Sequence, residues 1–135
     1  AATILALVAC GKPADEDSHE EMASSKGVGP VQSVVIPATI DAALAAKGLQ
    51  IFEDKCTACH KHGERYVGPD LNGVTERRQP EWIMNMIVNP IEMTQKDPVA
   101  KELLGEYLSQ MTNQNVNEDD ARALLEHFRE NDASL

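Results

Sequence analysis

The sequence predicts a small all-α domain with long loops, preceded by an N-terminal extension. Capping residues or prolines open four segments in which apolar residues recur every three or four positions, the spacing of one helix face. The alternation of apolar and polar residues that marks a half-buried strand is nearly absent. A chain of 135 residues has room for one such domain and an extension.

The first predicted helix is capped by Thr39 or Asp41 and runs to about Asp54. Its apolar face carries Ile40, Leu44, Gly48, Ile51 and Phe52. The second helix begins at Pro80, because proline suits a first helical turn, and it ends at Asn89-Pro90. Its apolar positions are Trp82, Ile83, Met86 and Ile87.

The third predicted helix opens at Asp97-Pro98, and its apolar positions are Val99, Leu103, Leu104, Tyr107 and Leu108. Asn117 caps the last helix, whose first turn holds three acidic residues placed favourably against the helix dipole. The buried face of that helix is formed by Ala121, Leu124, Leu125 and Phe128. Together these helices predict a folded domain over residues 38–135.

The composition limits the classes of protein to which the chain can belong. Aromatic residues make up only 4% of it, so a core built from protein side chains alone is thin, and a buried prosthetic group would supply apolar volume. The net charge of −10 makes nucleic acid an unsuitable partner, because phosphate binding needs a basic surface. The acidity serves solubility first, and a second reading is steering toward a basic patch on a protein partner.

The N-terminal segment resembles part of an export signal. Residues 1–9 are apolar and uncharged, but a helix that spans a bilayer needs roughly 20 residues. They resemble the end of a signal peptide, and Leu7-Val8-Ala9-Cys10-Gly11 resembles the lipobox of bacterial lipoproteins. This resemblance implies cleavage before Cys10, its acylation, and a membrane anchor on the periplasmic side of a bacterial cell envelope. An ordinary signal peptide with an incidental cysteine is the alternative.

Residues 10–37 are predicted to form a lipid-anchored, flexible acidic linker. Acidic residues are followed by a stretch rich in Ser, Gly and Pro, a mixture that buries little surface and stays mobile. Within it, Val34-Val35-Ile36 is either a short strand or an apolar patch that docks on the domain or on a partner.

The motif Cys56-Thr57-Ala58-Cys59-His60 predicts covalent attachment of one haem c. Two thiols three positions apart can reach the two vinyl groups on one haem edge, and the following histidine is then held under the iron as a ligand. A thioredoxin-like redox pair would need strands, which the pattern lacks. A structural zinc site would need four ligands, and no cysteine follows Cys59.

At these residues the sequence resembles the class I cytochrome c family, over almost all of residues 40–130. Gly48 and Phe52 resemble the family's glycine and aromatic residue on the first helix, and Leu124 matches the leucine that meets them on the last helix. His127 departs from the family, which usually has Tyr or Trp there. Gly68-Pro69-Asp70-Leu71 resembles the family's Gly-Pro-x-Leu. The resemblance implies that the Pro69 carbonyl accepts the Nδ1 proton of His60 and that Leu71 packs on the haem edge.

The sixth iron ligand is predicted to be a methionine. The resemblance favours Met111, in a polar segment before the last helix, although Thr112 stands where the family often has proline. Met93 is the runner-up, in an expected loop after Pro90. Met84 and Met86 are expected to fill the core. Trp82 either donates its indole N–H to a haem propionate or packs in the core.

These features predict an electron carrier with a His60/Met111 haem and no enzymatic activity. The expected partners are redox proteins, either met by a tethered carrier or joined to it in a quinol-oxidising assembly, such as an alternative complex III, or in a terminal oxidase complex. A haem enzyme or gas sensor with a labile sixth ligand is the alternative, and a non-haem lipoprotein that binds a partner or metal is a third reading.

Overall fold

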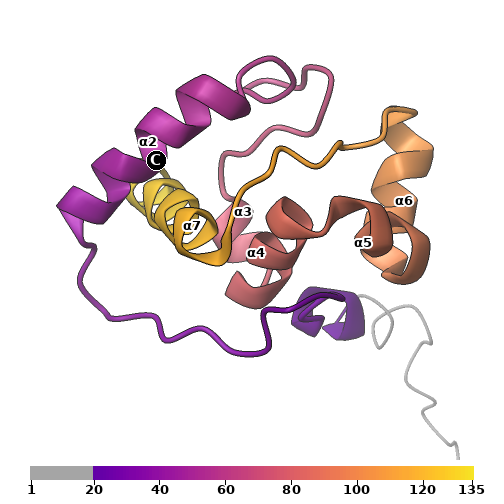
Figure 1. The fold of residues 1–135 in the computed structure, drawn as a ribbon, viewed down its shortest axis with the longest axis horizontal. Coiled ribbons are helices and arrows are strands. Elements are labelled where there is room, and N and C mark those ends of the chain that lie inside the picture. Colours follow the sequence, from indigo (N-terminus) through magenta and orange to yellow (C-terminus); the bar gives the residue numbers. More distant parts are fainter. Residues whose placement is uncertain (1–19) are drawn as a thin grey trace, which may run out of the picture.

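The computed structural model describes residues 20–135, and within this range the chain is helical with no strands. A helical stretch at residues 20–24 precedes the six helices labelled in Figure 1. They are α2 (Ala42–Lys55), α3 (Val74–Arg77), α4 (Pro80–Val88), α5 (Pro90–Lys96), α6 (Pro98–Tyr107) and α7 (Glu118–Ala133). The predicted all-α fold is confirmed. Cys10 and residues 1–9 lie outside the described residues.

The helices begin where polar side chains satisfy their free N–H groups. Asp41, rather than Thr39, caps α2 by accepting from the Leu44 N–H at 3.0 Å. Asn117 caps α7, and Asp97 caps α6, each by the same type of side-chain bond. Of the helices in residues 20–135, none has the length and apolar run needed to cross a membrane.

Two of these helices were not predicted from the sequence. Helix α5 begins at Pro90, so Asn89-Pro90 ends α4 and also starts the next helix: the Asn89 N–H donates to Asn85, and the Asn89 carbonyl accepts from Met93. Met93 therefore lies in a helix and not in the expected loop. Helix α3 is a single turn that follows Gly73, which has a φ of +71°.

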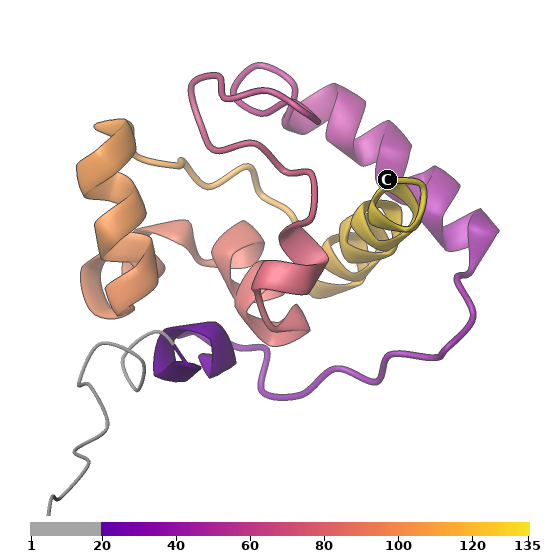
Figure 2. The ribbon, with the colours of Figure 1, turned by 180° about the vertical axis from the view of Figure 1, so that it is seen from behind.

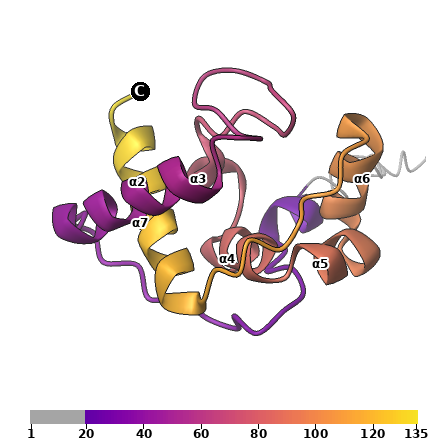
Figure 3. The ribbon, with the colours of Figure 1, turned by 45° about the horizontal axis from the view of Figure 1, so that its top comes forward.

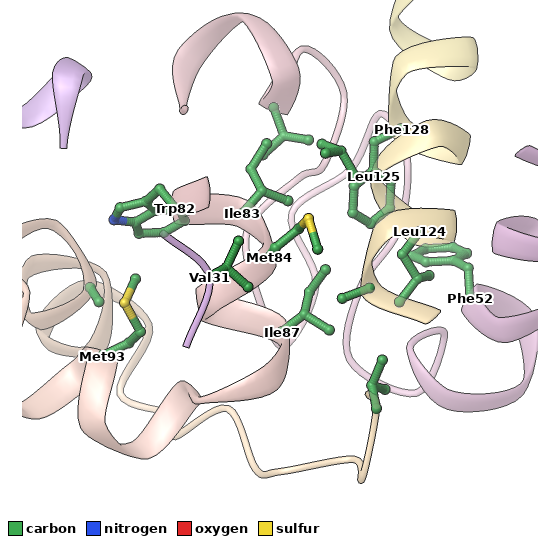
Figure 4. Close-up of a cluster of buried hydrophobic side chains, with 14 of the residues drawn as sticks. Val31, Phe52, Trp82, Ile83, Met84, Ile87, Met93, Leu124, Leu125 and Phe128 are labelled. Carbon is green, nitrogen blue, oxygen red and sulfur yellow. The ribbon is translucent and has the colours of Figure 1, made fainter. Parts of the chain in front are cut away.

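The framework of the domain is the crossing of α2 and α7, which is visible in Figures 1 and 3. A side chain at Gly48 would overlap the backbone carbonyl of Ala123, so only glycine permits this approach. Leu124 is fully buried at the crossing, and Phe52 lies within the same core. The predicted role of Gly48 with Leu124 agrees with this packing. Figure 4 shows the α4 side chains Ile83, Met84 and Ile87 directed toward the α7 side chains.

Residues 25–37, here called the strap, lie along the domain. Val31 is buried and donates its N–H to Asn85 Oδ1 at 3.0 Å, while Asn85 Nδ2 donates to the carbonyls of Lys26 and Val31. Figures 1 and 2 show the strap running from the side of α5 past α4 to the start of α2.

The prediction of a flexible linker is therefore wrong for residues 25–37. Their backbone groups find partners in side chains of α4 and α5, such as Glu81 for the Val34 N–H and the Met93 sulfur for the Val28 N–H. Residues 34–36 form no strand, and Val35 is 86% exposed.

Candidate functional site

A largely apolar cavity lies between the end of α2, helices α4 and α6, and the segment before α7. It gathers most of the residues that the sequence singled out. Those that line it are Cys56, Cys59, His60, Pro69, Leu71, Trp82 and Met111. Apolar side chains from α4, α6 and α7 complete the walls, among them Ile83, Ile87, Leu103, Leu104, Leu124 and Phe128.

The two cysteines and the histidine reach the cavity because the chain coils tightly after α2. Cys56 is the C-terminal cap of α2, and its carbonyl accepts from the N–H groups of Cys59 and His60 at 3.1 and 2.9 Å. Both thiols are free, with Cys56 half-buried and Cys59 exposed. Burial raises the pKa of the Cys56 thiol to about 11, although nearby Lys55 opposes this, so the thiol is neutral at physiological pH.

His60 is held as a neutral imidazole with a defined tautomer. Its Nδ1 lies 3.2 Å from the Pro69 carbonyl oxygen, which can only accept, so the proton is on Nδ1 and the Nε2 lone pair is free for a metal. Burial lowers the pKa of His60, and the bond to Pro69 partly offsets that effect. This geometry matches the role predicted for Pro69.

Gly68 is a residue of this site that the sequence reasoning did not assign. A side chain at Gly68 would overlap the His60 ring, so the loop passes the imidazole with backbone alone. The Gly68 N–H also donates to the Cys59 carbonyl at 2.8 Å. Its position directly before Pro69 in the Gly-Pro-x-Leu motif was the available signal.

The loop that carries Pro69 is ordered by its own hydrogen bonds. Asp70 Oδ1 accepts from the backbone N–H groups of Asn72 and Gly63 at 2.9 and 2.7 Å. The bond from Asn72 is the main reason that the pKa of Asp70 is lowered. The Leu71 N–H closes the loop on the Lys61 carbonyl. The acceptor for His60 is thus fixed by a structured loop.

Two methionines line the cavity, and the runner-up is not one of them. Met111 lines it from the segment before α7, and Met86 lines it from α4. Met93 is fully buried beneath the strap, where its sulfur accepts from the Val28 N–H at 3.0 Å. Met84 lies in the core next to α7, as Figure 4 shows. Met86 was expected to fill the core, and its position on the cavity wall was not predicted.

Trp82 lies on the cavity wall, but its N–H is not available to a propionate. The indole Nε1 donates to Asp97 Oδ1 at 3.0 Å, and the side chain is buried. The core-packing reading of Trp82 therefore holds, and the propionate reading does not.

Basic residues on the cavity wall suit the two carboxylates of a haem better. Lys55, Arg77 and Arg78 line the cavity, and Arg78 is half-buried above the Trp82 ring. Burial lowers the pKa of Arg78, which means that a nearby anion would stabilise its charge. The sequence reasoning missed Arg77 and Arg78 because the end of α3 brings them to the cavity, and this short helix was not predicted.

Two further histidines among residues 20–135 form a separate pair outside the cavity. The Nε2 atoms of His62 and His127 are 3.2 Å apart, and both rings pack near Phe52. Within residues 20–135, no three His, Cys, Asp or Glu side chains come together to hold a metal ion. The geometry therefore does not support the zinc reading.

An all-helical fold that closes an apolar cavity over two free thiols and a neutral, oriented histidine defines a c-type cytochrome. The chain belongs to the cytochrome c family, whose model, described as Cytochrome c, matches residues 45–131. The cofactor is accordingly a covalently bound c-type haem with its iron, and Cys56 and Cys59 fit the attachment motif. Family membership supports haem-based electron transfer as the function.

Solved structures with the same fold include a cytochrome c from Rhodothermus marinus, with 44% identity, a TM-score of 0.79, and coverage of 87% of this chain and 99% of that one. An engineered cytochrome c from the same organism is 47% identical, with a TM-score of 0.76 and coverage of 78% of this chain and 91% of that one. The engineered protein has also been solved bound to a carbene intermediate. A cytochrome c domain from Pseudomonas putida is 33% identical with a TM-score of 0.58, covering 64% and 88%. A search among curated protein sequences found no significant match.

Proposed function

We propose that the protein carries single electrons on a haem whose iron would be held by His60 and Met111, and that it is not an enzyme. The observation that carries this proposal is the placement of an oriented, neutral His60 and of Met111 on the wall of one apolar cavity. The haem supplies the one-electron chemistry when bound. The chain supplies the ligands, the exclusion of water and the surface that partners meet.

Each side of the cavity has a separate effect on the reduction potential. On one side, the bond from His60 to Pro69 makes the imidazole a stronger donor, which favours Fe(III). On the other, the thioether of Met111 favours Fe(II) and raises the potential relative to two histidines. The apolar walls from α4, α6 and α7 disfavour the extra charge of the oxidised site. These opposing effects on the reduction potential suit an electron carrier whose iron ligands stay in place in both oxidation states.

The membrane anchor remains a proposal based on the lipobox-like sequence around Cys10. With lipid on Cys10, only residues 11–24 separate the anchor from the strap, a reach of at most roughly 50 Å. The domain would thus stay near the periplasmic face of a bacterial membrane. There it passes electrons between redox proteins, either as a tethered carrier or as a subunit of a quinol-oxidising or terminal oxidase complex.

Three methionine variants test the ligand assignment. Met111→Ala should keep its haem, shown by pyridine haemochrome analysis, and lower the reduction potential by on the order of 100 mV or more. It should also lose the weak far-red absorption band of methionine-ligated ferric haem. Met86→Ala and Met93→Ala should keep that band and shift the potential much less. Loss of the band in Met86→Ala alone would move the ligand to Met86.

Two further measurements separate the remaining readings. Ready binding of carbon monoxide to the native reduced protein would favour a gas sensor or haem enzyme with a labile sixth position over the carrier. Cys10→Ala should release the protein from the membrane fraction, whereas an unchanged distribution would contradict the lipid anchor. Purification of the native protein in mild detergent then distinguishes a free carrier from a fixed subunit by the proteins that accompany it.

A further inference from the structure

Arg65 joins two segments that both contribute residues to the wall of the haem cavity. Its Nη1 donates to Glu106 Oε1 at 2.7 Å, and its Nη2 donates to the Glu106 backbone carbonyl at 3.4 Å. The guanidinium carbon also lies 4.0 Å from the centre of the Tyr107 ring. One planar group therefore makes three contacts with the last turn of α6, which a lysine cannot reproduce.

The first of the two segments is the loop that begins directly after His60. Inside it, the Tyr66 N–H donates to the Gly68 carbonyl, and the Gly68 N–H donates to the Cys59 carbonyl. Arg65 thus projects from a loop that is bonded back to the haem-attachment turn. Figure 1 shows this loop and the end of α6 on the same side of the molecule.

The second segment leads to Met111. Tyr107 lines the cavity and is the last residue of α6. Leu108 caps the helix with a left-handed φ of 53° and is 85% exposed. The chain then crosses to α7 through residues 108–117, which form no regular element. The contact with Arg65 therefore fixes the point from which this segment starts.

Apart from the buried side chain of Val116, few contacts in the described structure hold the segment in place. The side chain of Gln110 lies 2.9 Å from the Thr94 hydroxyl, and the exposed Lys55 ammonium donates to the Gln114 carbonyl at 3.2 Å. Met111 lies between these two attachments. The segment contains no proline that would stiffen it, and Thr112 stands directly after Met111, where the family often has proline. The position of Met111 thus depends on a small number of contacts on either side of it in the sequence.

We propose that Arg65 is a positioning residue that keeps the Met111 segment closed over the cavity and so slows displacement of the methionine by external ligands. The inference rests on the proposed His60/Met111 ligation. An exposed ion pair alone contributes little, but here a stack on Tyr107 and a backbone bond act together with it. Loss of all three should raise the population of the open segment by on the order of tenfold.

Imidazole binding to the ferric holoprotein measures that opening. Arg65→Ala should bind imidazole about tenfold faster than the wild type, with unchanged haem content. Lys61→Ala is the matched control, since Lys61 lies in the same loop but its ammonium pairs with Glu64 and lies over the Tyr66 ring, away from α6. Arg65→Lys should lie between the two because it keeps the charge without the planar fork. Equal rates for Arg65→Ala and Lys61→Ala would overturn the proposal.

A second variant and a ligand control keep the outcomes distinct. Glu106→Gln removes only the charge of the acceptor and should accelerate binding less than Arg65→Ala, while the double variant should be no faster than Arg65→Ala. If Met111→Ala leaves the far-red band intact, the proposed ligation fails. If Met111→Ala removes that band and Arg65→Ala still binds imidazole at the wild-type rate, the inference about Arg65 alone fails.

Discussion

The indole Nε1 of Trp82 lies 3.0 Å from Oδ1 of Asp97, and the bond is buried between α4 and the start of α6. The same Oδ1 accepts from the Ala100 N–H at 2.9 Å, and Oδ2 accepts from the Ser25 hydroxyl at 3.0 Å. One carboxylate therefore connects the wall of the haem cavity, the N-terminus of α6 and the strap.

Replacement of Asp97 should destabilise the domain strongly. Asp97→Ala leaves the Trp82 N–H buried without a partner and removes the cap of α6, so we expect a loss of about 3 kcal/mol in the free energy of unfolding. Urea unfolding of the holoprotein measures it. Glu102→Gln, an exposed change on the same helix, serves as the control and should cost less than about 0.5 kcal/mol. Similar values for both variants would contradict the role of Asp97.

Gly68 should tolerate no side chain. In Gly68→Ala the new methyl group overlaps the His60 ring, so the imidazole must turn away from Pro69. We expect a lower yield of haem-loaded protein and a changed ferric absorption spectrum. Gly105→Ala is the matched control, because nothing lies within 4 Å of a side chain there; in the last turn of α6 it should stabilise by at most about 0.5–1 kcal/mol. A normal spectrum for Gly68→Ala would show that the ring has room.

The attachment of the strap to the domain should depend on Gly27. This residue has a φ of +72°, and a side chain on it would lie 2.7 Å from the Met93 sulfur. Gly27→Ala should therefore loosen the strap and speed tryptic cleavage after Lys26, which in the wild type is paired with Glu81 at 3.1 Å. Val35→Ala, at an exposed strap position, should leave the cleavage rate unchanged. Equal rates for the two variants would mean that Gly27 does not hold the strap.

Acid stability should depend on Glu126. Burial alone would raise its pKa, but the Asp41 N–H, Arg122 and Arg129 together hold the pKa below its usual value. Because the pKa is lower in the folded state, the contribution to stability is complete above the unfolded value of about 4.3 and is lost as the pH falls through the folded pKa.

Glu126→Gln should therefore be less stable than the wild type at neutral pH, and the difference should shrink below about pH 4. Urea unfolding at a series of pH values checks this, with the exposed neighbour Glu130→Gln as the control. A difference from the wild type that stays constant with pH would contradict the assignment.

Local signals in the sequence predict much of this fold and site. Asp41, Asp97 and Asn117 mark helix starts because a cap acts within three residues of itself. The orientation of His60 by Pro69, nine positions away, was implied by the resemblance of Gly68-Pro69-Asp70-Leu71 to the family motif. Helix α5 was missed because Asn-Pro usually marks an end, and seven residues are too few to show periodicity.

The contacts that the sequence does not reveal are those between distant segments. The strap has the polar composition of a mobile linker, yet its partners Glu81, Asn85 and Asp97 lie more than forty positions further along the chain. Met86 and Arg78 reach the cavity only through the packing of α4 and the turn before it. The composition of a segment indicates how much surface the segment can bury by itself. It does not reveal the hydrogen-bond partners and apolar surfaces that a distant segment provides.

The attachment of the strap also determines how the domain bears mechanical load. A pull on the chain ahead of Ser25 is transmitted first to the bonds with Asp97, Asn85 and Met93, on α5 and its neighbours. It reaches α2, which is followed directly by the haem-attachment motif, only after those bonds have broken and residues 25–37 have extended. A force applied at that end of the chain is thus taken up by the strap before it reaches the haem-attachment motif.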